Sequence, residues 1–496
     1  MDFSIDFGIE DIVCVAPAII VFIASIIPLT FKVLRGNVEM RHGVSVTYAL
    51  AGLSAALLSS LVLYSQQTNV FYAFYRALVF DGLSVFSTVM VILVTSVALI
   101  FSKEHFATKG KQFSEYIFLL MNSAIGMMIL AWSNDLIVTF IGIEMMSLCL
   151  YLLVALSNEE TLSKEASFKY FVLGSLASAV FLYGLAFIFG ITGTTYIDKL
   201  LEIAPAAISS NYMFLMGILF LILGFCFKVS IAPFHAWTPD VYEGAPTPVT
   251  GFMATGVKLV TFVAFLRVLV GDYLTSDLTG RMTDILQWLA VLTMLVGNIG
   301  AIMQNGVKRM LAYSSVAHSG YILMGLIAAA VGGESWLGAT GVTYYIFAYS
   351  IMTIGAFGVL SILERHEADL YSMDDLKGLA SRSPWLAACF ALFLLSLAGI
   401  PPTVGFFGKF FLFSAAVKQG FFWMAVWAAI NSIISVYYYL RPIVKMYMED
   451  GESRVTNPEV SSSMVAVSIM AVLVLATGLA TEPVYDFVLT AVNSLF

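Results

Sequence analysis

Charged side chains are scarce in this sequence. Only 11% of the 496 residues are Asp, Glu, Lys or Arg, whereas a soluble protein has about 25%. Hydrophobic residues make up 60% of the chain, and its mean hydropathy is +0.92. A water-soluble core cannot absorb that excess, but a bilayer can, because the outside of a membrane protein is as apolar as its inside. The composition therefore predicts an integral membrane protein.

Cysteine is also rare, and it carries no motif. Cys14, Cys149, Cys226 and Cys389 lie far apart, without a CxxC pair or a neighbouring histidine cluster, which argues against iron–sulfur, zinc and haem-attachment sites. A GxGxxG run is missing as well, so the sequence offers no dinucleotide-binding fingerprint. The formal net charge of -8 is scattered and includes no basic run that would indicate nucleic acid.

What the chain does contain is a series of apolar segments about 20 residues long, the length that spans a bilayer. The fourteen predicted spans lie near residues 11–31, 46–65, 80–101, 114–132, 135–156, 168–192, 212–234, 247–270, 284–303, 309–330, 338–362, 385–413, 420–442 and 461–481. We therefore expect an all-α integral membrane fold of about fourteen transmembrane helices, with both termini on the same side.

Lysine and arginine set the expected orientation. They are concentrated in the loops that follow odd-numbered spans, such as Lys32, Arg35 and Arg41 after the first and Lys308 and Arg309 after the ninth. Loops rich in these residues face the cytoplasm. Both termini are therefore predicted to lie on the opposite, outer side.

Two spans contain helix-breaking residues close to a lysine. In span 7, Pro233 follows Lys228, and in span 12 Gly399, Pro401, Pro402 and Gly405 precede Lys409. Proline removes a backbone donor and clashes with the preceding turn. Breaks at membrane depth are tolerated where the freed carbonyls face protein or a wet cavity, so they point to a transport path. The alternative is that the prolines are only packing kinks.

The two interrupted spans also indicate an internal repeat. They are five spans apart, so spans 4–8 and 9–13 form two five-helix repeats with helices 7 and 12 in corresponding places. Because five is odd, the second copy is inverted, as is common in transporters. The predicted division is an N-terminal three-helix segment in 1–110, a first repeat in 111–272, a second, inverted repeat in 280–447 and a C-terminal helix 14 in 448–496.

Four ionisable residues are predicted to lie inside the membrane: Glu144, Lys228, Lys258 and Lys409. Each such charge costs about 2.5–3.5 kcal/mol at the centre of a membrane helix, so folding alone would not retain it. Glu144 and Lys228 are expected to pair, Lys258 to act as a central relay, and Lys409 to be the outlet or next carrier of a proton. The alternative is a buried ion pair that only holds helices together.

Two histidines are second-rank candidates. His235 follows Pro233 at the end of span 7, and His318 lies within span 10. A histidine at this depth can relay protons through either ring nitrogen. A simple hydrogen bond to a neighbouring Ser or Tyr is the competing role for each.

Four segments carry a resemblance to a known family. They are FIGIEMMSLCLYLLVA in span 5, KVSIAPFHAWTPDVYEGAPTPVTGFMATGVK in spans 7 and 8, KRMLAYSSVAHSGYILMG in span 10 and LKGLASRSPWLAACFALFLLSLAGIPPTVGFFGKF leading into span 12. In these segments the chain resembles the antiporter-like membrane subunits of respiratory complex I, the NADH:quinone oxidoreductase. Lys409, where subunit M has glutamate, argues against that branch, and the lack of a long lateral helix after span 14 argues against subunit L.

The resemblance implies a fourteen-helix fold with two antiporter-like repeats and a proton channel. It assigns Glu144, Lys228, Lys258 and Lys409 to the family's proton-translocating positions. The chain would be part of a translocase but would perform no redox chemistry of its own.

The resemblance also implies cofactors and partners. This chain would bind no cofactor, because NADH, FMN, iron–sulfur clusters and quinone would lie in partner subunits. Its partners would be neighbouring antiporter-like and small membrane subunits, together with lipid but no nucleic acid. Its place would be the bacterial plasma (inner) membrane, as a multi-pass protein with both termini periplasmic.

Two other functions remain open. A subunit of a multi-subunit sodium/proton antiporter has the same fold and a similar charge pattern, and sodium efflux without NADH-linked activity would favour it. A structural membrane scaffold, in which the charges only lock helices, is the second alternative.

Overall fold

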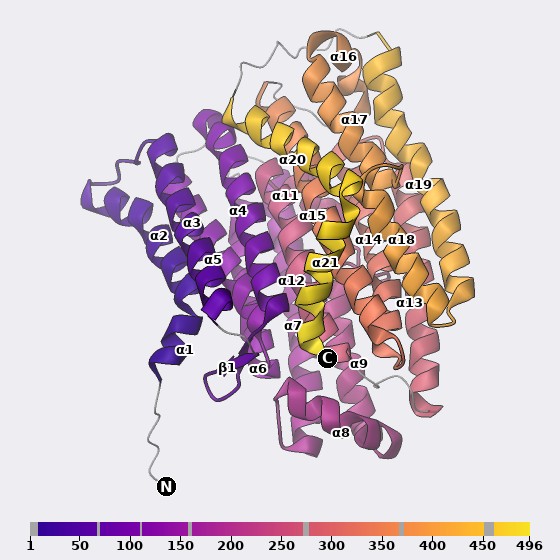
Figure 1. Ribbon diagram of the computed structural model, residues 1–496. Coiled ribbons are helices and arrows are strands. Elements are labelled where there is room, and N and C mark those ends of the chain that lie inside the picture. Colours follow the sequence, from indigo (N-terminus) through magenta and orange to yellow (C-terminus); the bar gives the residue numbers. More distant parts are fainter. Residues whose placement is uncertain are drawn as a thin grey trace.

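The computed structural model describes residues 8–66, 70–109, 112–156, 161–270, 277–366, 372–450 and 461–496. Within these ranges, twelve helices are long and apolar enough to cross a membrane, and two shorter apolar helices, Tyr212–Lys228 and Pro384–Ala398, bring the total to fourteen. They follow the predicted spans in order, and most run side by side through one bundle (Figure 1). The prediction of an all-α membrane protein is confirmed.

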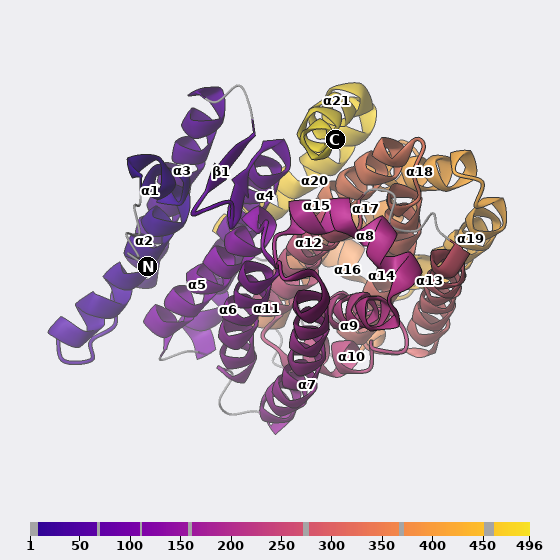
Figure 2. The same cartoon turned by 90° about the horizontal axis from the view of Figure 1, so that it is seen from below.

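The N-terminal part lies at one end of the bundle, in indigo in Figures 1 and 2. Between its third and fourth helices the chain forms a small antiparallel hairpin, in which Phe71 pairs with Phe80 and Ala73 with Leu78. The elements are α1 (Ile9–Cys14), α2 (Ala16–Leu34), α3 (His42–Gln66), β1 (Phe71–Ala73), β2 (Leu78–Phe80) and α4 (Gly82–Lys109). The sequence did not predict the hairpin, because two three-residue strands give no usable periodicity.

The first repeat corresponds to spans 4–8. A short helix, α8, precedes the interrupted helix and lies across the end of the bundle in Figure 1. The elements are α5 (Phe113–Trp132), α6 (Leu136–Ala155), α7 (Thr161–Thr192), α8 (Ile197–Ser210), α9 (Tyr212–Lys228), α10 (Trp237–Gly244), α11 (Thr247–Phe252), a π-helical turn (Met253–Val257) and α12 (Lys258–Leu269).

The second repeat corresponds to spans 9–13 and is followed by the C-terminal helices. Its elements are α13 (Asp277–Met303), α14 (Val307–Ala330), α15 (Ser335–His366), a 3₁₀ turn (Met373–Leu376), α16 (Leu379–Arg382), α17 (Pro384–Ala398), α18 (Val404–Lys418) and α19 (Phe422–Met448). The chain ends with α20 (Ser462–Leu479), α21 (Thr481–Val492) and a 3₁₀ turn (Asn493–Leu495). Helix α21 returns to pack against α4 and α15 (Figure 1).

The two repeats have the same order of elements. Each has three continuous spans, an interrupted fourth span (α9 and α10, or α17 and α18) and a fifth span. Five crossings make the second copy enter from the opposite side, as the sequence predicted. The predicted boundaries at 110–111 and 272 lie outside the described residues, as does much of the start of the segment 448–496.

The centre of the bundle is formed by three spans. In the most apolar 18-residue stretch of each span, the share of residues buried inside the protein is 100% for Thr247–Leu269 and 94% for α14 and α15. For α7 this share is only 33%. Polar groups on the three central spans are therefore shielded from lipid by the rest of the chain.

Candidate functional site

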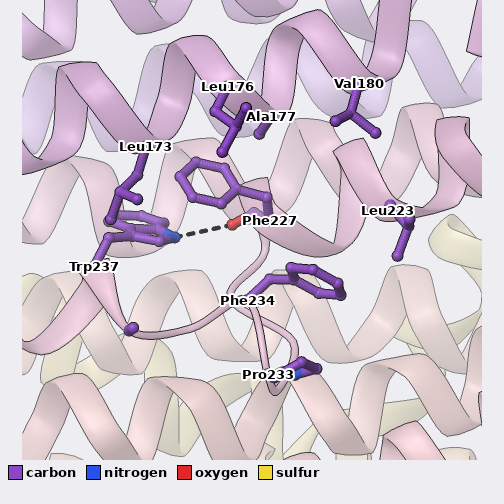
Figure 3. Close-up of a pocket in the computed structure, with 10 residues that line it drawn as sticks. Leu173, Leu176, Ala177, Val180, Leu223, Phe227, Pro233, Phe234 and Trp237 are labelled. Atoms are coloured by element: carbon purple, nitrogen blue, oxygen red, sulfur yellow. Dashed lines mark hydrogen bonds between the residues drawn. The ribbon is translucent and has the colours of Figure 1, made fainter. Parts of the chain in front are cut away.

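Helix α9 ends at Lys228, before the end of predicted span 7 at residue 234. Ser230 then has a positive φ of 63°, and Pro233 has no N–H to continue a helix. The chain becomes helical again at Trp237, the first residue of α10. The indole N–H of Trp237 donates a 3.0 Å hydrogen bond across the gap to the carbonyl of Phe227 (Figure 3). The predicted interruption is confirmed, with Lys228 at its edge.

Where it faces α7, the break borders a cavity of about 260 Å³ between α7 and α9 (Figure 3). Every residue that lines it is aliphatic or aromatic: Leu173, Leu176, Ala177, Val180, Leu223, Phe227, Pro233, Phe234, Ala236 and Trp237. Among the described residues, no acidic or basic side chain lines this cavity. A path for protons would therefore have to pass on the other side of the break, where Lys228 lies.

Lys228 is 3% exposed and binds α6. Its ammonium group donates a 2.8 Å hydrogen bond to the hydroxyl of Ser147. Glu144, one turn earlier on α6, instead accepts a hydrogen bond from Ser178 of α7. Within the described residues no ion pair joins Lys228 to Glu144, so the expected direct pair is not formed. Ser147 takes its place, because it lies three residues along the same helix face.

Lys258 is the first residue of α12 and is 1% exposed. It follows the π-helical turn Met253–Val257, a local irregularity that is frequent at functional sites. Its ammonium group donates to the hydroxyl of Ser319 at 2.7 Å and to the carbonyl of Ser315. The ring of Tyr349 lies 5.6 Å away. These partners are all neutral, which agrees with the expectation that Lys258 has no carboxylate beside it.

Ser319 joins Lys258 to the interrupted helix. Its hydroxyl donates a 2.5 Å hydrogen bond to the carbonyl of Val229, the residue that follows Lys228. One serine of α14 therefore holds the ammonium group of one lysine and the backbone beside the other. The sequence did not reveal this link, because it depends on how three helices pack.

His318, the residue before Ser319 on α14, is 1% exposed. The ring nitrogens of His318 lie 2.5 Å from the hydroxyl of Tyr345 on α15 and 2.8 Å from that of Tyr439 on α19. Tyr439 also contacts Ser314. His318 thus has the tyrosine partners expected for a structural histidine, yet it occupies the polar strip between Lys258 and α19.

Lys409 lies on α18 beyond the second break and is 4% exposed. It donates 2.8 Å and 3.0 Å hydrogen bonds to the carbonyl of Ala398 and the hydroxyl of Ser432. The ring of Tyr321, on α14, lies 5.2 Å from its nitrogen. Ala398 is the last residue of α17, so its carbonyl is one that the break leaves without a helical partner.

His235 lies between α9 and α10, away from these contacts. Its ring centre is 6.4 Å from that of Tyr313, and within the described part of the chain its buried Nδ1 has no hydrogen-bond partner. The structure brings Lys228, Lys258, His318 and Lys409 together around α14, but it does not bring His235 into that network.

Sequence reasoning missed two buried ion clusters at the ends of the spans. Near the hairpin, Arg267 binds both oxygens of Asp81, at 2.8 and 2.7 Å, and donates to the carbonyl of Ala131 at 2.9 Å. At another site Glu364 pairs with Lys308 at 2.8 Å. Charges at span ends resemble solvated loop charges, and only tertiary packing shows that these are buried.

These features define the class: a polytopic membrane protein in which two interrupted helices meet a buried line of lysines. A family model described as "NADH:quinone oxidoreductase/Mrp antiporter, TM" matches residues 133–435, and the chain belongs to this family.

Within the family, the chain is similar to subunit N of NADH-quinone oxidoreductase. It is 50% identical over 487 residues to that subunit from Bdellovibrio bacteriovorus, covering 98% of this chain and 99% of the relative. This agrees with the lysine at position 409, which argued against subunit M.

Solved structures agree with the family. A chain of respiratory complex I from Thermus thermophilus has 32% identity and a TM-score of 0.78, over 95% of this chain and 98% of that one. A chain of the Mrp complex from Dietzia sp. has a TM-score of 0.84 over 98% of both chains, at 21% identity. The second likeness shows a shared fold alone.

Proposed function

We propose that this chain is the N subunit of a proton-translocating NADH:quinone oxidoreductase and that it carries protons along Lys228, Lys258 and Lys409. One observation supports the proposal most: a backbone carbonyl at each helix break is bound either by one of these lysines or by a serine that also binds one of them. Ser319 links the carbonyl of Val229 to Lys258, and Lys409 itself binds the carbonyl of Ala398.

The proposed order is Glu144 and Lys228, then Lys258, then His318 as a secondary carrier, then Lys409. A neutral amine accepts a proton and the resulting ammonium group passes it on, so each lysine alternates between two charge states. Moving a proton against 100 mV costs about 2.3 kcal/mol. Electrostatic coupling between charges in a low-dielectric interior is of that size or larger. Movement of a neighbouring charge is therefore sufficient to drive a step. His235 stays in the proposal only as a second-rank relay.

The redox chemistry is assigned to partner subunits. NADH, FMN, iron–sulfur clusters and quinone would bind there, and this chain would receive energy as an electrostatic or conformational change from neighbouring membrane subunits. The basic loops favour periplasmic termini in the bacterial inner membrane. The four-part division at 1–110, 111–272, 280–447 and 448–496 belongs to the same proposal.

A sodium/proton antiporter subunit is the weaker alternative. The fold does not separate the two functions, because a chain of an Mrp complex has the same architecture at 21% identity. The 50% identity to a subunit N favours the oxidoreductase. Sodium-dependent transport that persists without NADH oxidation would favour the antiporter.

The decisive experiment replaces Lys258 with alanine in the assembled complex. We expect quinone-coupled proton pumping per assembled complex to fall by about tenfold or more, because a positioned proton carrier contributes at least that much. Lys418→Ala, the same change at an exposed residue at the end of α18, is the control and should have no effect. Full pumping in Lys258→Ala would overturn the proposal.

A further inference from the structure

A second group of buried ionisable side chains lies at the end of the bundle away from the hairpin. Helix α4 leaves the hairpin at Gly82, and His105 is near its other end. His105 Nδ1 lies 3.9 Å from a carboxylate oxygen of Glu364, at the end of α15. The other carboxylate oxygen is 2.8 Å from Lys308, in the first turn of α14. Thr247, the first residue of α11, also donates to Glu364.

All three ionisable side chains of this cluster are shielded. The exposed fractions are 8% for His105, 9% for Lys308 and 15% for Glu364. Four spans therefore bring their ends together on one carboxylate. The neighbouring charges on α10 and α14 are paired elsewhere, because Glu243 binds Arg309 at 2.7 Å.

The cluster connects to Lys258 through α10 and α14. Lys308 lies 3.5 Å from the carbonyl of Ala245, and Thr250 donates to the carbonyls of both Ala245 and Tyr242. The side chain of Tyr242 in turn interacts with Ser315, whose carbonyl accepts from Lys258. The specific sequence motif HAWTPDVYEGAPTPV, which contains α10, thus lies between Glu364 and the central lysine.

Distance requires such intermediate groups. Thr247 and Lys258 are eleven residues apart on one nearly continuous span, which is about 16 Å at 1.5 Å per residue. A direct transfer over that length is impossible. Buried hydroxyl groups of Tyr242, Ser315 and Tyr349 lie near Lys258 and can hand a proton on; Tyr349 donates to Ser315 at 2.8 Å. The carbonyls of Ala245 and Tyr242 only accept hydrogen bonds, so the part of the path next to Glu364 requires a water molecule.

The chemistry of the cluster differs from that of a structural lock. The Asp81–Arg267 pair at the hairpin end is bidentate, and arginine stays charged at all relevant pH values. Glu364 instead faces Lys308 and the imidazole of His105, and imidazole is the side chain that changes charge between pH 5 and 8. The same chain therefore contains a fixed ion pair at one end and an exchangeable cluster at the other.

We propose that Glu364, held by Lys308 and Thr247 and faced by His105, is the proton-exchange site that loads Lys258 from the end of the bundle opposite the hairpin. The carboxylate takes a proton from the aqueous side, and the acid passes it through water and hydroxyl groups to the neutral amine of Lys258. This leaves a carboxylate and an ammonium group. The inference rests on the proposed function, because it needs Lys258 to be a proton carrier.

The test compares Glu364→Gln with Asp81→Asn and Lys258→Ala in the assembled complex. Glutamine keeps the size but cannot ionise, and its amide retains only one of the two acceptor oxygens that Lys308 and Thr247 bind. Pumping per assembled complex should therefore fall by about tenfold or more, while Glu364→Asp retains activity. The solvent deuterium isotope effect on pumping should rise in Glu364→Gln, because proton loading becomes rate-limiting. Asp81→Asn should change neither the pumping per assembled complex nor the isotope effect.

The outcomes separate the two proposals. Full pumping in Lys258→Ala rejects the proposed function. Loss in Lys258→Ala with wild-type pumping in Glu364→Gln rejects only the loading site. Equal losses of pumping in Glu364→Gln and Asp81→Asn, with an unchanged isotope effect, would show that the cluster only holds helices together. That result also rejects the loading site. If Glu364→Gln does not assemble, Thr247→Val decides: a raised isotope effect supports the site, and an unchanged one overturns it.

Discussion

The ammonium group of Lys409 donates a 2.8 Å hydrogen bond to the carbonyl of Ala398, the last residue before the break in span 12. The next residue, Gly399, has a positive φ of 88° and ends α17 in the left-handed conformation. A Cβ atom at this position would lie 3.0 Å from Cδ and 3.3 Å from Nζ of Lys409. The glycine therefore provides both the turn and the room for the lysine.

We predict that Gly399→Ala displaces Lys409 and lowers proton pumping severalfold. Any L-residue at this φ costs about 1–2 kcal/mol, so part of the effect is general strain. Gly420→Ala is the matched control, because Gly420 has a φ of 85° and a Cβ atom there would have no neighbour within 4 Å among the described residues. Pumping and thermal stability are measured for both variants. Equal pumping losses in the two would show that strain, and not the contact with Lys409, is responsible.

Ser319→Ala should uncouple Lys258 from the first helix break. The change removes the donor to the carbonyl of Val229 and one acceptor of Lys258, and a buried unsatisfied carbonyl costs about 1–3 kcal/mol. We expect lower stability of the subunit together with reduced pumping per assembled complex.

The control for this change is Ser350→Ala. Ser350 is 1% exposed, and its hydroxyl donates within its own helix, to the carbonyl of Ile346. Its removal should leave pumping unchanged. Loss of stability in Ser319→Ala without any loss of pumping would restrict Ser319 to a structural role.

The sequence could predict that three lysines within the spans are buried but not how they connect. The broken spans follow from Pro233 and from Gly399–Pro402, because proline and glycine act locally. The burial of Lys228, Lys258 and Lys409 follows from the apolar runs that contain them. The Ser147 contact of Lys228, the Ser319 bridge and the π-helical turn before Lys258 depend on packing between helices, for which one sequence has no local signal.

The charges at the ends of spans show the same limit. Glu364 lies at the end of predicted span 11, where a solvated loop charge is the usual interpretation. Glu364 is buried only because the ends of α4, α11, α14 and α15 pack together around it. The sequence therefore identified the lysine line within the membrane and missed the cluster at its end.

Outside the spans, Asp374 should make the attachment of the 3₁₀ turn to α19 sensitive to pH. Hydrogen bonds from Lys445 and Lys377 hold the pKa of Asp374 below its ordinary value. A lowered folded-state pKa means that this contribution to stability is present above the unfolded pKa and is lost as pH falls through the folded one. The side chain is 62% exposed, so the effect is small and screened by salt.

Hydrogen exchange at Gly378 reports on this attachment, because its amide donates to the carbonyl of Lys445 at 3.3 Å. After correction for intrinsic rates, protection should decrease as pH falls below about 4, the ordinary pKa of an aspartate, in the unmodified chain. Asp374→Asn should be less protected at neutral pH and should show no such decrease. A pH response that survives in Asp374→Asn would assign it to another group.

A double-mutant cycle on Glu144 and Lys228 distinguishes proton transport from helix locking. Because Lys228 binds Ser147 and not Glu144, Glu144→Gln and Lys228→Met should couple by less than about 1 kcal/mol in assembly, whereas Ser147→Ala and Lys228→Met should couple more strongly. Each change at Glu144 or Lys228 should lower pumping per assembled complex, and the double variant should not recover it.

If the charges only lock helices, the double variant will instead assemble poorly and pump at the normal rate for each complex that forms. Pumping normalised to the amount of assembled complex measures the difference directly, since locking changes the amount of complex and proton transfer changes its turnover.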